Sequence, residues 1–478
     1  MRKEFFSSEI ISGTIKLIDF TAIMLIGAAA YVVYLAGYLE TSNYSSYEYI
    51  GRYFITSASG AFLFLIIYQR MGGYRFELLA RPNWQLPRAT LAWFGSFSIL
   101  LVLAFVAKIS ESYSRGWTIS WIIGVAVFLP ISRIIINLAI TRWAGHGHFL
   151  RNIVVVGAGE DGKRFIEKIQ NNHDSGVRIL GVFDDRKSRL TPLGPGIDLL
   201  GNTDDLLEFA RKTPVDEIIV ALPLNAGERL HTLFDKLRSL PTDLRLSIEP
   251  LAGMFPIRGI NQIVDMPLLQ IADRPLKQWS GVIKKFEDFI LTSLLLAMFA
   301  PAMALIALII KFDSPGPVFF VQDRFGFNNK AIRVLKFRTM YWDKGDPAGA
   351  QRTVRNDLRV TRFGRFVRAF SLDELPQLLN VLRGEMSLVG PRPHAIVMKA
   401  GDRLYHEAVD TYFHRHRVKP GITGWAQVNG LRGEINSIDK ARRRVAYDLE
   451  YIERWSIWLD LKILLMSLGV LFKRENAY

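Results

Sequence analysis

Two neighbouring carboxylates, Asp373 and Glu374, stand in the segment SLDELPQLLN. Three arginines precede them in TRFGRFVRAF, namely Arg362, Arg365 and Arg368. Carboxylates surrounded by guanidinium groups can hold a divalent cation such as Mg²⁺ and can receive a phosphate group. The residue types and their spacing therefore indicate phosphate chemistry, with Arg368 as the arginine nearest to the acidic pair in the chain.

A structural interpretation of the acidic pair fits the same spacing. Ser371 and Glu374 form the pattern S-x-x-E of a capping box, in which both side chains bond to backbone amides at a helix start. On spacing alone this interpretation is the better supported of the two. Pro376 weakens it, because proline prefers the first helical position and so leaves both carboxylates just outside the helix.

Further cationic and polar candidates lie in segments rich in glycine and proline. The segment VLKFRTM reads as a strand and places Lys336 and Arg338 on the same side. Arg392 follows in VGPRP, and Gln427 and Arg432 follow in VKPGITGWAQVNGLRG. Each could bind substrate, but a solvated basic face and structural turns explain the same residues.

A glycine motif occurs earlier, in VVVGAGEDGKRF. Gly157, Gly159 and Gly162 form G-x-G-x-x-G between a predicted strand and a predicted helix. Asp184, or its neighbour Asp185, ends the next strand, where a carboxylate can bind a ribose hydroxyl. Glycines at these positions also permit close packing without any ligand, so nucleotide binding stays one of two interpretations.

The composition indicates a basic membrane protein. Half of the 478 residues are hydrophobic, and the formal net charge is +15. Such a charge suits an anionic membrane face, nucleic acid or phosphorylated substrates. The chain has no cysteine, which excludes disulfide bonds and thiolate metal sites.

Four apolar runs near the N-terminus each approach the roughly 20 residues that cross a bilayer as a helix. The segment between the second and third runs holds four arginines, whereas loop 39–48 holds no lysine or arginine. The positive-inside rule therefore places the N-terminus and segment 69–88 in the cytoplasm. We expect a bundle of four transmembrane helices over 1–145, built from the runs 17–38, 50–68, 89–107 and 117–141.

Two further domains are predicted after these helices. Strands alternate with helices over 150–250, which is typical of a small Rossmann-like α/β domain with a parallel sheet. The later segment 289–310 has no charged residue, has basic flanks and contains Pro301 near its centre. A helix kinked at Pro301 that enters the membrane and returns keeps both flanks in the cytoplasm, and a full crossing is the alternative.

The later motifs resemble those of the bacterial sugar transferase family. The resemblance rests on DSPGPVFFVQDRFG, VLKFRTM, SLDELPQLLNVLRGEMSLVGPRP and HRVKPGITGWAQVNG, in this order. These proteins are polyprenyl-phosphate hexose-1-phosphate transferases, also termed large monotopic phosphoglycosyl transferases. The core resemblance covers about 280–478, and the C-terminal segment is similar to that of glucose-using members from exopolysaccharide pathways.

The resemblance implies that hexose-1-phosphate moves from a UDP-sugar to undecaprenyl phosphate, with release of UMP. It implies a monotopic α/β catalytic domain over 280–478, held at the cytoplasmic face of the bacterial inner membrane by a re-entrant helical hairpin over 286–311. The family's catalytic acidic pair matches Asp373 and Glu374, with Mg²⁺ as cofactor. Its basic substrate-binding positions match Lys336, Arg338, Arg368 and Arg392.

Within this scheme, we expect Asp373 to attack the sugar-bearing phosphorus, and we expect Glu374 and Asp373 to be the carboxylate ligands of Mg²⁺. We also expect a homodimer and no nucleic-acid partner. An NAD-dependent membrane nucleotide-sugar dehydratase is a rival, but no tyrosine has a lysine four residues later, as its Tyr-x-x-x-Lys pair requires. A non-catalytic membrane sensor that binds a nucleotide at the Gly157 loop is a further rival.

Overall fold

The computed structural model divides the chain into two compact units, Met1–Leu150 and Arg151–Tyr478. Five helices of the described residues are long and apolar enough to cross a membrane: four in the first unit and one in the second. Most of loop 39–48, which the positive-inside argument used, lies outside the described residues. These residues are 7–33, 47–79, 81–145, 150–172, 176–186, 196–223, 227–248, 261–263, 266–344, 357–400, 403–433 and 437–472.

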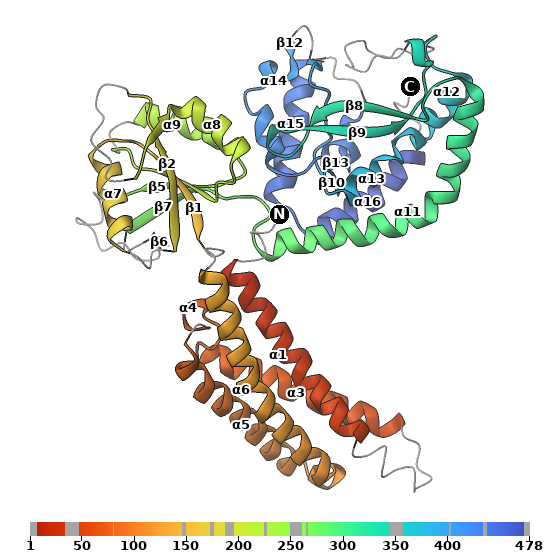
Figure 1. Cartoon of the computed structure of the whole chain (residues 1–478). Coiled ribbons are helices and arrows are strands. Elements are labelled where there is room, and N and C mark those ends of the chain that lie inside the picture. Colours follow the sequence, from red (N-terminus) through yellow and green to blue (C-terminus); the bar gives the residue numbers. More distant parts are fainter. Residues whose placement is uncertain are drawn as a thin grey trace. The chain divides into compact units, whose positions relative to one another are not determined.

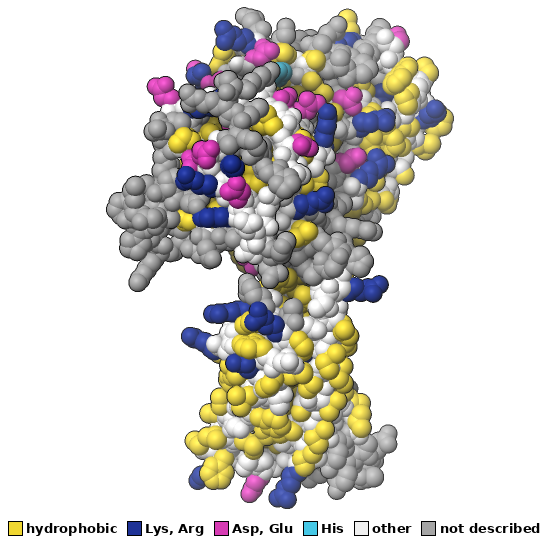
Figure 2. All heavy atoms as spheres, turned by 60° about the vertical axis from the view of Figure 1, so that its left-hand side comes forward, with side chains coloured by type: hydrophobic (Ala, Val, Ile, Leu, Met, Phe, Trp, Pro, Cys, Tyr) yellow, Lys and Arg dark blue, Asp and Glu magenta, His cyan; other side chains and the backbone are white. Residues whose placement is uncertain are grey.

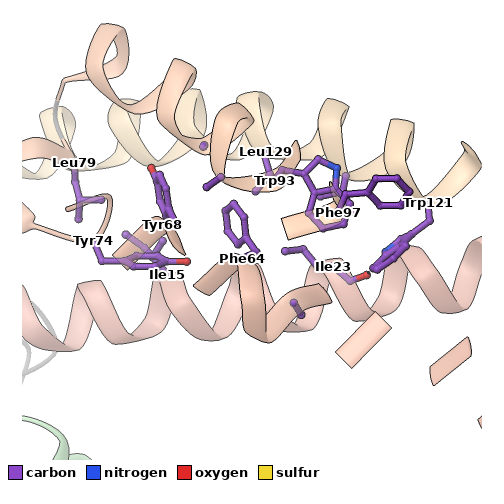
Figure 3. Close-up of a cluster of buried hydrophobic side chains, with 14 of the residues drawn as sticks. Ile15, Ile23, Phe64, Tyr68, Tyr74, Leu79, Trp93, Phe97, Trp121 and Leu129 are labelled. Carbon is purple, nitrogen blue, oxygen red and sulfur yellow. The ribbon is translucent and has the colours of Figure 1, made fainter. Parts of the chain in front are cut away.

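Four long helices of the first unit pack against one another (Figure 1). Aromatic side chains dominate the core between them, as Figure 3 shows for Phe64, Trp93 and Trp121. Figure 2 shows hydrophobic side chains over much of the outer surface, which suits helices surrounded by lipid. The elements are α1 (Ser8–Tyr31), α3 (Tyr47–Arg70), α4 (Phe76–Leu79), α5 (Pro82–Val106), η3 (Ser110–Ser112) and α6 (Arg115–Gly145).

A buried ion pair explains why a charged residue is tolerated inside the fourth apolar run. The Arg133 guanidinium on α6 donates to both carboxylate oxygens of Asp19 on α1, at 3.0 and 2.6 Å. The hydroxyl of Tyr74 donates to the same carboxylate at 2.7 Å. Both charges are almost fully buried, so each depends on the other for compensation.

Replacing Arg133 with methionine is expected to destabilise the helical unit by about 3–5 kcal/mol, because Asp19 remains buried without its partner. Thermal unfolding of the detergent-solubilised protein measures this effect. The double replacement Asp19→Asn with Arg133→Met should recover part of the loss, since no buried charge remains. An unchanged unfolding temperature for Arg133→Met would show that the pair contributes little.

The second unit begins with a seven-stranded sheet in the order β3-β2-β1-β4-β5-β7-β6. The five strands from β3 to β5 are parallel, and β7 and β6 extend the sheet in the antiparallel sense. The sheet thus continues past residue 250, where the sequence suggested that this domain ends. Its strands are β1 (Arg151–Val156), β2 (Val177–Phe183), β3 (Leu199–Gly201), β4 (Glu217–Val220), β5 (Asp243–Ser247), β6 (Asn261–Ile263) and β7 (Met266–Ala272).

Hydrophobic clusters fill both faces of this sheet. The helices α8 and α9 cover one face, and α7 packs on the other (Figure 1). This arrangement follows from nearly continuous apolar strands such as IVVV in β1, which are buried on both sides. The helices are α7 (Glu160–Asn171), α8 (Thr203–Lys212) and α9 (Gly227–Leu237).

The rest of the second unit is built around the long helix α11 (Trp279–Asp313) and the hairpin of β8 (Phe319–Phe325) and β9 (Ala331–Phe337). A second, parallel strand pair joins β10 (Ser387–Val389) and β13 (Gly421–Thr423). The other helices and short elements are η4 (Phe327–Asn329), η5 (Trp342–Lys344), α12 (Arg362–Ala369), η6 (Leu372–Glu374), α13 (Gln377–Leu382), β11 (Lys399–Ala400), β12 (Arg403–Leu404), α14 (Tyr405–Ala408), η7 (Tyr412–Arg417), η8 (Gln427–Leu431), α15 (Ile438–Glu453) and α16 (Ile457–Phe472).

Both halves of α11 are fastened to the same body of protein. In the first half, the Lys284 ammonium group donates to Asp460 on α16 at 2.5 Å, and Asp288 accepts from the Ser387 hydroxyl at 2.9 Å. In the second half, Ile306 and Ile310 pack beside α12. Pro301 lies between the halves, and Figure 1 shows a bent ribbon that passes α16 first and α12 later.

Candidate active site

A short 3₁₀ turn, η6, presents the two carboxylates between α12 and α13. Ser371 precedes it with a left-handed backbone (φ 57°), which is uncommon for a residue other than glycine. The helix α13 begins at Gln377, so Asp373 and Glu374 lie outside it. Their side chains are 14% and 13% exposed, which makes the pair largely buried but accessible.

The capping-box interpretation is wrong. Ser371 makes no side-chain bond to the backbone amides of η6; its hydroxyl instead accepts a hydrogen bond from Arg432 at 2.6 Å. The Glu374 carboxylate accepts from Lys336 at 2.8 Å and from Arg392, through Nη1 at 3.1 Å and through Nη2. The acidic side chains therefore face cations from distant parts of the chain.

One buried amide fixes the distance between η6 and β9, the strand that carries Lys336. Asn380 on α13 is fully buried; its side chain accepts from the Leu335 amide at 3.0 Å and donates to the Arg333 carbonyl at 2.8 Å. These two bonds occupy the edge of β9 as a paired strand would. They hold the acidic turn beside Lys336, whose ammonium group lies 3.8 Å from the Asp373 carboxylate.

A network behind the pair holds Arg392. The Arg415 guanidinium donates to the Arg392 carbonyl at 2.7 Å, and its charge is balanced by buried Asp448 at 2.6 Å. Arg324 donates to the Pro393 carbonyl at 2.8 Å. These bonds fix the peptide groups on both sides of Pro393, so they hold the backbone from which the Arg392 side chain reaches Glu374.

The pKa values of the two carboxyl groups are shifted in opposite directions. Burial raises the pKa of Asp373, and the charge of Glu374 adds to this effect against the opposing charge of Lys336. Burial also opposes ionisation of Glu374, but the charges and hydrogen bonds of Arg392 and Lys336 outweigh it and hold its pKa well below the usual value. Glu374 is therefore the permanently ionised member, and Asp373 is the member whose protonation state varies.

This difference predicts a pH dependence. If Asp373 reacts as a carboxylate, activity should fall as the pH decreases through its raised pKa. Lys336 lowers that pKa, so Lys336→Met is expected to move the acid limb of the pH–rate profile to higher pH. The profile, normalised to each variant's own maximum, measures the shift. A limb that stays in place or moves to lower pH would contradict the assignment.

The structure brings most of the predicted substrate-binding residues to the pair. Lys336 and Arg392 contact Glu374 directly, and Arg432 contacts Ser371. Arg368 donates to the Thr339 hydroxyl at 2.7 Å and lies close enough to Asp373 for their charges to interact.

Two predicted residues make other contacts. Arg338 donates to the Ser314 carbonyl at 2.6 Å and to the Pro315 carbonyl at 3.0 Å, so it closes the turn after α11. Gln427 is buried and donates to the Ile422 carbonyl at 3.4 Å, while its side-chain oxygen has no partner among the described residues. These contacts give both side chains a structural role.

Arg324 is a site residue that the sequence reasoning missed. It is half-buried on β8, and the loss of hydration together with the neighbouring charge of Arg392 lowers its pKa to about 10. At neutral pH it stays charged. The signal was present in the motif DSPGPVFFVQDRFG, where Arg324 is the only cation.

The glycine motif lies at the carboxyl end of β1. Gly157 has φ 115°, and a Cβ there would lie 2.5 Å from the Ala221 carbonyl oxygen; a Cβ at Gly162 would lie 2.0 Å from the Gly157 carbonyl oxygen. Gly159 caps α7. Asp184 accepts from the Ala158 amide at 2.8 Å, so its carboxylate already binds the glycine loop. Close packing thus accounts for two of the glycines, and nucleotide binding stays a prediction.

A small pocket nevertheless opens beside this loop. Gly157 and Asp184 line it together with Arg229 and Lys236 of α9. Arg229 forms an ion pair with Asp184 at 3.4 Å. Cations and carboxylates therefore balance in this pocket, unlike the cation-rich surroundings of Asp373.

Comparison with known proteins decides the family. The profile of the bacterial sugar transferases matches residues 279–474, the part that holds α11 and the acidic pair. A UDP-glucose:undecaprenyl-phosphate glucose-1-phosphate transferase of Escherichia coli K12 is 34% identical over 87% of this chain and 89% of its own. The chain belongs to the bacterial sugar transferase family.

Other relatives of this sugar transferase bear on its substrate. An undecaprenyl-phosphate glucose phosphotransferase of Komagataeibacter xylinus is 40% identical over 75% of the chain and 66% of its own length. A UDP-N-acetylgalactosamine-undecaprenyl-phosphate N-acetylgalactosaminephosphotransferase of Aeromonas hydrophila is 39% identical over 41% of the chain and 45% of its own. The profile of a CoA-binding domain matches residues 69–247 of the sugar transferase.

Proposed function

We propose that this enzyme transfers glucose-1-phosphate from UDP-glucose to undecaprenyl phosphate and releases UMP. The observation that carries the proposal is the acidic pair, which is surrounded by cations within the region that matches the sugar transferases. Glucose is favoured because the relatives from Komagataeibacter xylinus and Escherichia coli, which match most of the chain, are a glucose phosphotransferase and a glucose-1-phosphate transferase. Such a reaction would begin the assembly of an exopolysaccharide or capsule at the membrane.

Asp373 is the proposed nucleophile. One of its carboxylate oxygens bonds to the phosphorus that carries the sugar, and the bond from that phosphorus to the bridging oxygen breaks, which releases UMP. An oxygen of undecaprenyl phosphate then bonds to the same phosphorus, and the aspartyl–phosphorus bond breaks. The bond between sugar and oxygen is untouched throughout, so the anomeric configuration is retained.

The cations reduce the repulsion between an anionic nucleophile and an anionic diphosphate. Lys336 and Arg392 both contact Glu374, and each can extend a further N–H donor to phosphate oxygens. Arg368 lies on the Asp373 side and can stabilise the charge that develops on the attacked phosphoryl group. Arg392 can do so with two parallel hydrogen bonds, because its guanidinium group is planar.

Mg²⁺ fits this donor set. Among the described residues no group of three or more carboxylates and histidines could hold a metal. Mg²⁺, however, needs only one or two carboxylates when substrate phosphates supply the other oxygens. Glu374 would hold it, and when bound it would neutralise charge on the departing UMP.

The geometry of α11 favours the re-entrant arrangement over a full crossing. A straight α-helix of this length would extend about 52 Å, and a full crossing would place its two ends on opposite sides of the bilayer. Yet Lys284 near its start and Ile310 near its end both pack on the catalytic region. We propose that the exposed apolar bend enters the cytoplasmic leaflet of the inner membrane, beneath a cytoplasmic catalytic domain, and that the four earlier helices span the bilayer as a bundle.

Two further features belong to the proposal. The strand order from β3 to β5 supports a Rossmann-like fold for the sheet. We expect the enzyme to form a homodimer and to bind no nucleic acid. Cross-linking in native membranes tests the oligomeric state.

Incubation of the purified protein in nanodiscs with undecaprenyl phosphate and UDP-glucose labelled in the sugar tests the function. Transfer of label into lipid with equimolar UMP release is the expected result. NAD-dependent loss of water from the sugar would identify a dehydratase instead, and the absence of any conversion would favour a sensor. A parallel set of UDP-sugars decides whether glucose is the preferred donor.

A further inference from the structure

The helix α12 carries a stack of aromatic rings on its outer side. Phe363 and Phe366 stack with ring centroids 6.1 Å apart, and Phe366 and Phe370 follow at 5.0 Å. Spacings of three and four residues place these rings in one row along the helix. Phe366 is 53% exposed and Phe370 is 45% exposed. We call these three residues the Phe row.

The Phe row adjoins the second half of α11. Val367, the next residue after Phe366, is fully buried against Ile306 and Ile310 of α11, and Phe363 packs at the edge of the same cluster. The outward side of this half of α11 is apolar and exposed at Leu305 and Leu308. The exposed apolar surface of the candidate membrane helix therefore continues onto α12, which lies beside it in Figure 1.

The Phe row also leads to the reactive carboxylate. Residues 363 to 370 span about 10 Å along a helix axis, and Asp373 follows only three residues later. Leu372, between them, belongs to the cluster that joins α11 and α12. An apolar chain lying along the Phe row would thus have one end at the acidic pair and the other at the surface that faces lipid.

Charge on the same helix fits a ligand with one anionic end. Arg362 and Arg365 are exposed beside the start of the Phe row, whereas Arg368, near its end, donates to Thr339 and lies close enough to Asp373 for their charges to interact. Lys336 and Arg392 lie at the acidic pair beyond it. A row of aromatic rings that leads to these three cations matches a long branched hydrocarbon that carries a phosphate at one end. A peptide or a soluble sugar nucleotide offers no such hydrocarbon.

We propose that the Phe row binds the isoprenoid chain of the lipid acceptor and so directs its phosphate to Asp373. This inference rests on the proposed function, and it adds a binding surface for the second substrate. The occupant is the polyprenyl chain itself rather than bulk membrane lipid.

The test compares Phe366→Ala/Phe370→Ala with the native enzyme in nanodiscs. Exchange of labelled UMP into UDP-glucose requires no lipid acceptor, so it reports the folding and the sugar-nucleotide half of the site. Transfer is then measured at varied undecaprenyl phosphate, with rates normalised to exchange. We expect the KM for undecaprenyl phosphate to rise about tenfold, as the loss of aromatic contacts implies.

Trp458→Ala is the matched control. Trp458 is 77% exposed on α16, and α16 packs beside the first half of α11 through Lys284 and Asp460. The KM of Trp458→Ala for undecaprenyl phosphate should equal that of the native enzyme. An equal rise in both variants would indicate general contact with the bilayer and would overturn the proposal, as would an unchanged KM in the Phe row variant.

A short isoprenyl phosphate provides a second measurement. The native enzyme should favour the long acceptor over the short one, and the Phe row variant should lose most of that preference. The single variant Phe366→Leu keeps an apolar side chain and should retain most of the preference for the long acceptor. It replaces the double variant in this measurement if the double variant does not fold. If the native enzyme neither exchanges nor transfers label, the proposed function fails; if it does both and chain-length preference is unaffected, only this inference fails.

Discussion

Asp373→Asn is expected to abolish turnover, with a loss of roughly 10⁴-fold or more, as for removal of a nucleophile in covalent catalysis. Asparagine keeps the size of the side chain but cannot form the aspartyl–phosphorus bond. Both UMP release from UDP-glucose and UMP exchange should disappear, because both depend on the first step. Folding should be preserved, since the direct contact of Asp373 within the described part of the chain is a 3.8 Å ion pair with Lys336.

Asp323→Asn is the matched control. Asp323 lies on β8, next to the site residue Arg324, but its side chain is exposed. Its activity should be near that of the native enzyme. A labelled sugar phosphate that stays attached to native protein after denaturation, and is absent from Asp373→Asn, would identify the covalent bond. Exchange at the native rate in Asp373→Asn would show that another group attacks phosphorus.

The sequence identified the acidic pair but misjudged its environment. S-x-x-E spacing suggested a local cap, because spacing reports only residues near in the chain. The contacts that decide the outcome come from residues far away: Arg432 binds Ser371, and Lys336 and Arg392 bind Glu374. Long-range pairing of this kind leaves no periodic pattern, so the spacing alone favoured a cap and the family motifs favoured the catalytic role.

Arg338 and Lys336 show a limit of the strand rule. Alternation along an extended strand places residues two apart on one face. The strand β9, however, ends at Phe337, and Arg338 turns toward the carbonyls of Ser314 and Pro315. A strand boundary moved by one or two residues is therefore enough to change the role assigned to a side chain.

The apolar runs predicted the helices of the first unit well. They did not predict which residues balance the charged side chains inside those helices. The run 89–107 corresponds to α5, which begins earlier because Pro82 occupies its first turn. The fourth run contains Arg133, whose charge is balanced by Asp19 of α1. A hydropathy profile averages over residues that are close in the sequence, so it cannot reveal a pair between residues 114 positions apart.

Glu374→Gln is expected to lower the transfer rate by about 10²–10³-fold, the range for loss of one fixed electrostatic contact in an active site. The glutamine side chain keeps the shape but removes the charge that Lys336 and Arg392 share. It also removes the proposed ligand of Mg²⁺. The variant should therefore need more Mg²⁺ for half-maximal activity, whereas a purely structural effect would lower the rate at every Mg²⁺ concentration alike.

Binding of Mn²⁺ in the presence of UDP, followed by electron paramagnetic resonance, separates the two roles without any turnover. Glu374→Gln should bind Mn²⁺ more weakly than the native enzyme, and Glu374→Asp should recover part of that binding because it restores a carboxylate. Thermal unfolding of the same variants measures how far the two partly buried cations, Lys336 and Arg392, depend on Glu374 for stability. If Mn²⁺ binding were native in Glu374→Gln while stability fell, Glu374 would be an anchor for Lys336 and Arg392, and the metal ligand would have to be sought in the substrate phosphates and Asp373.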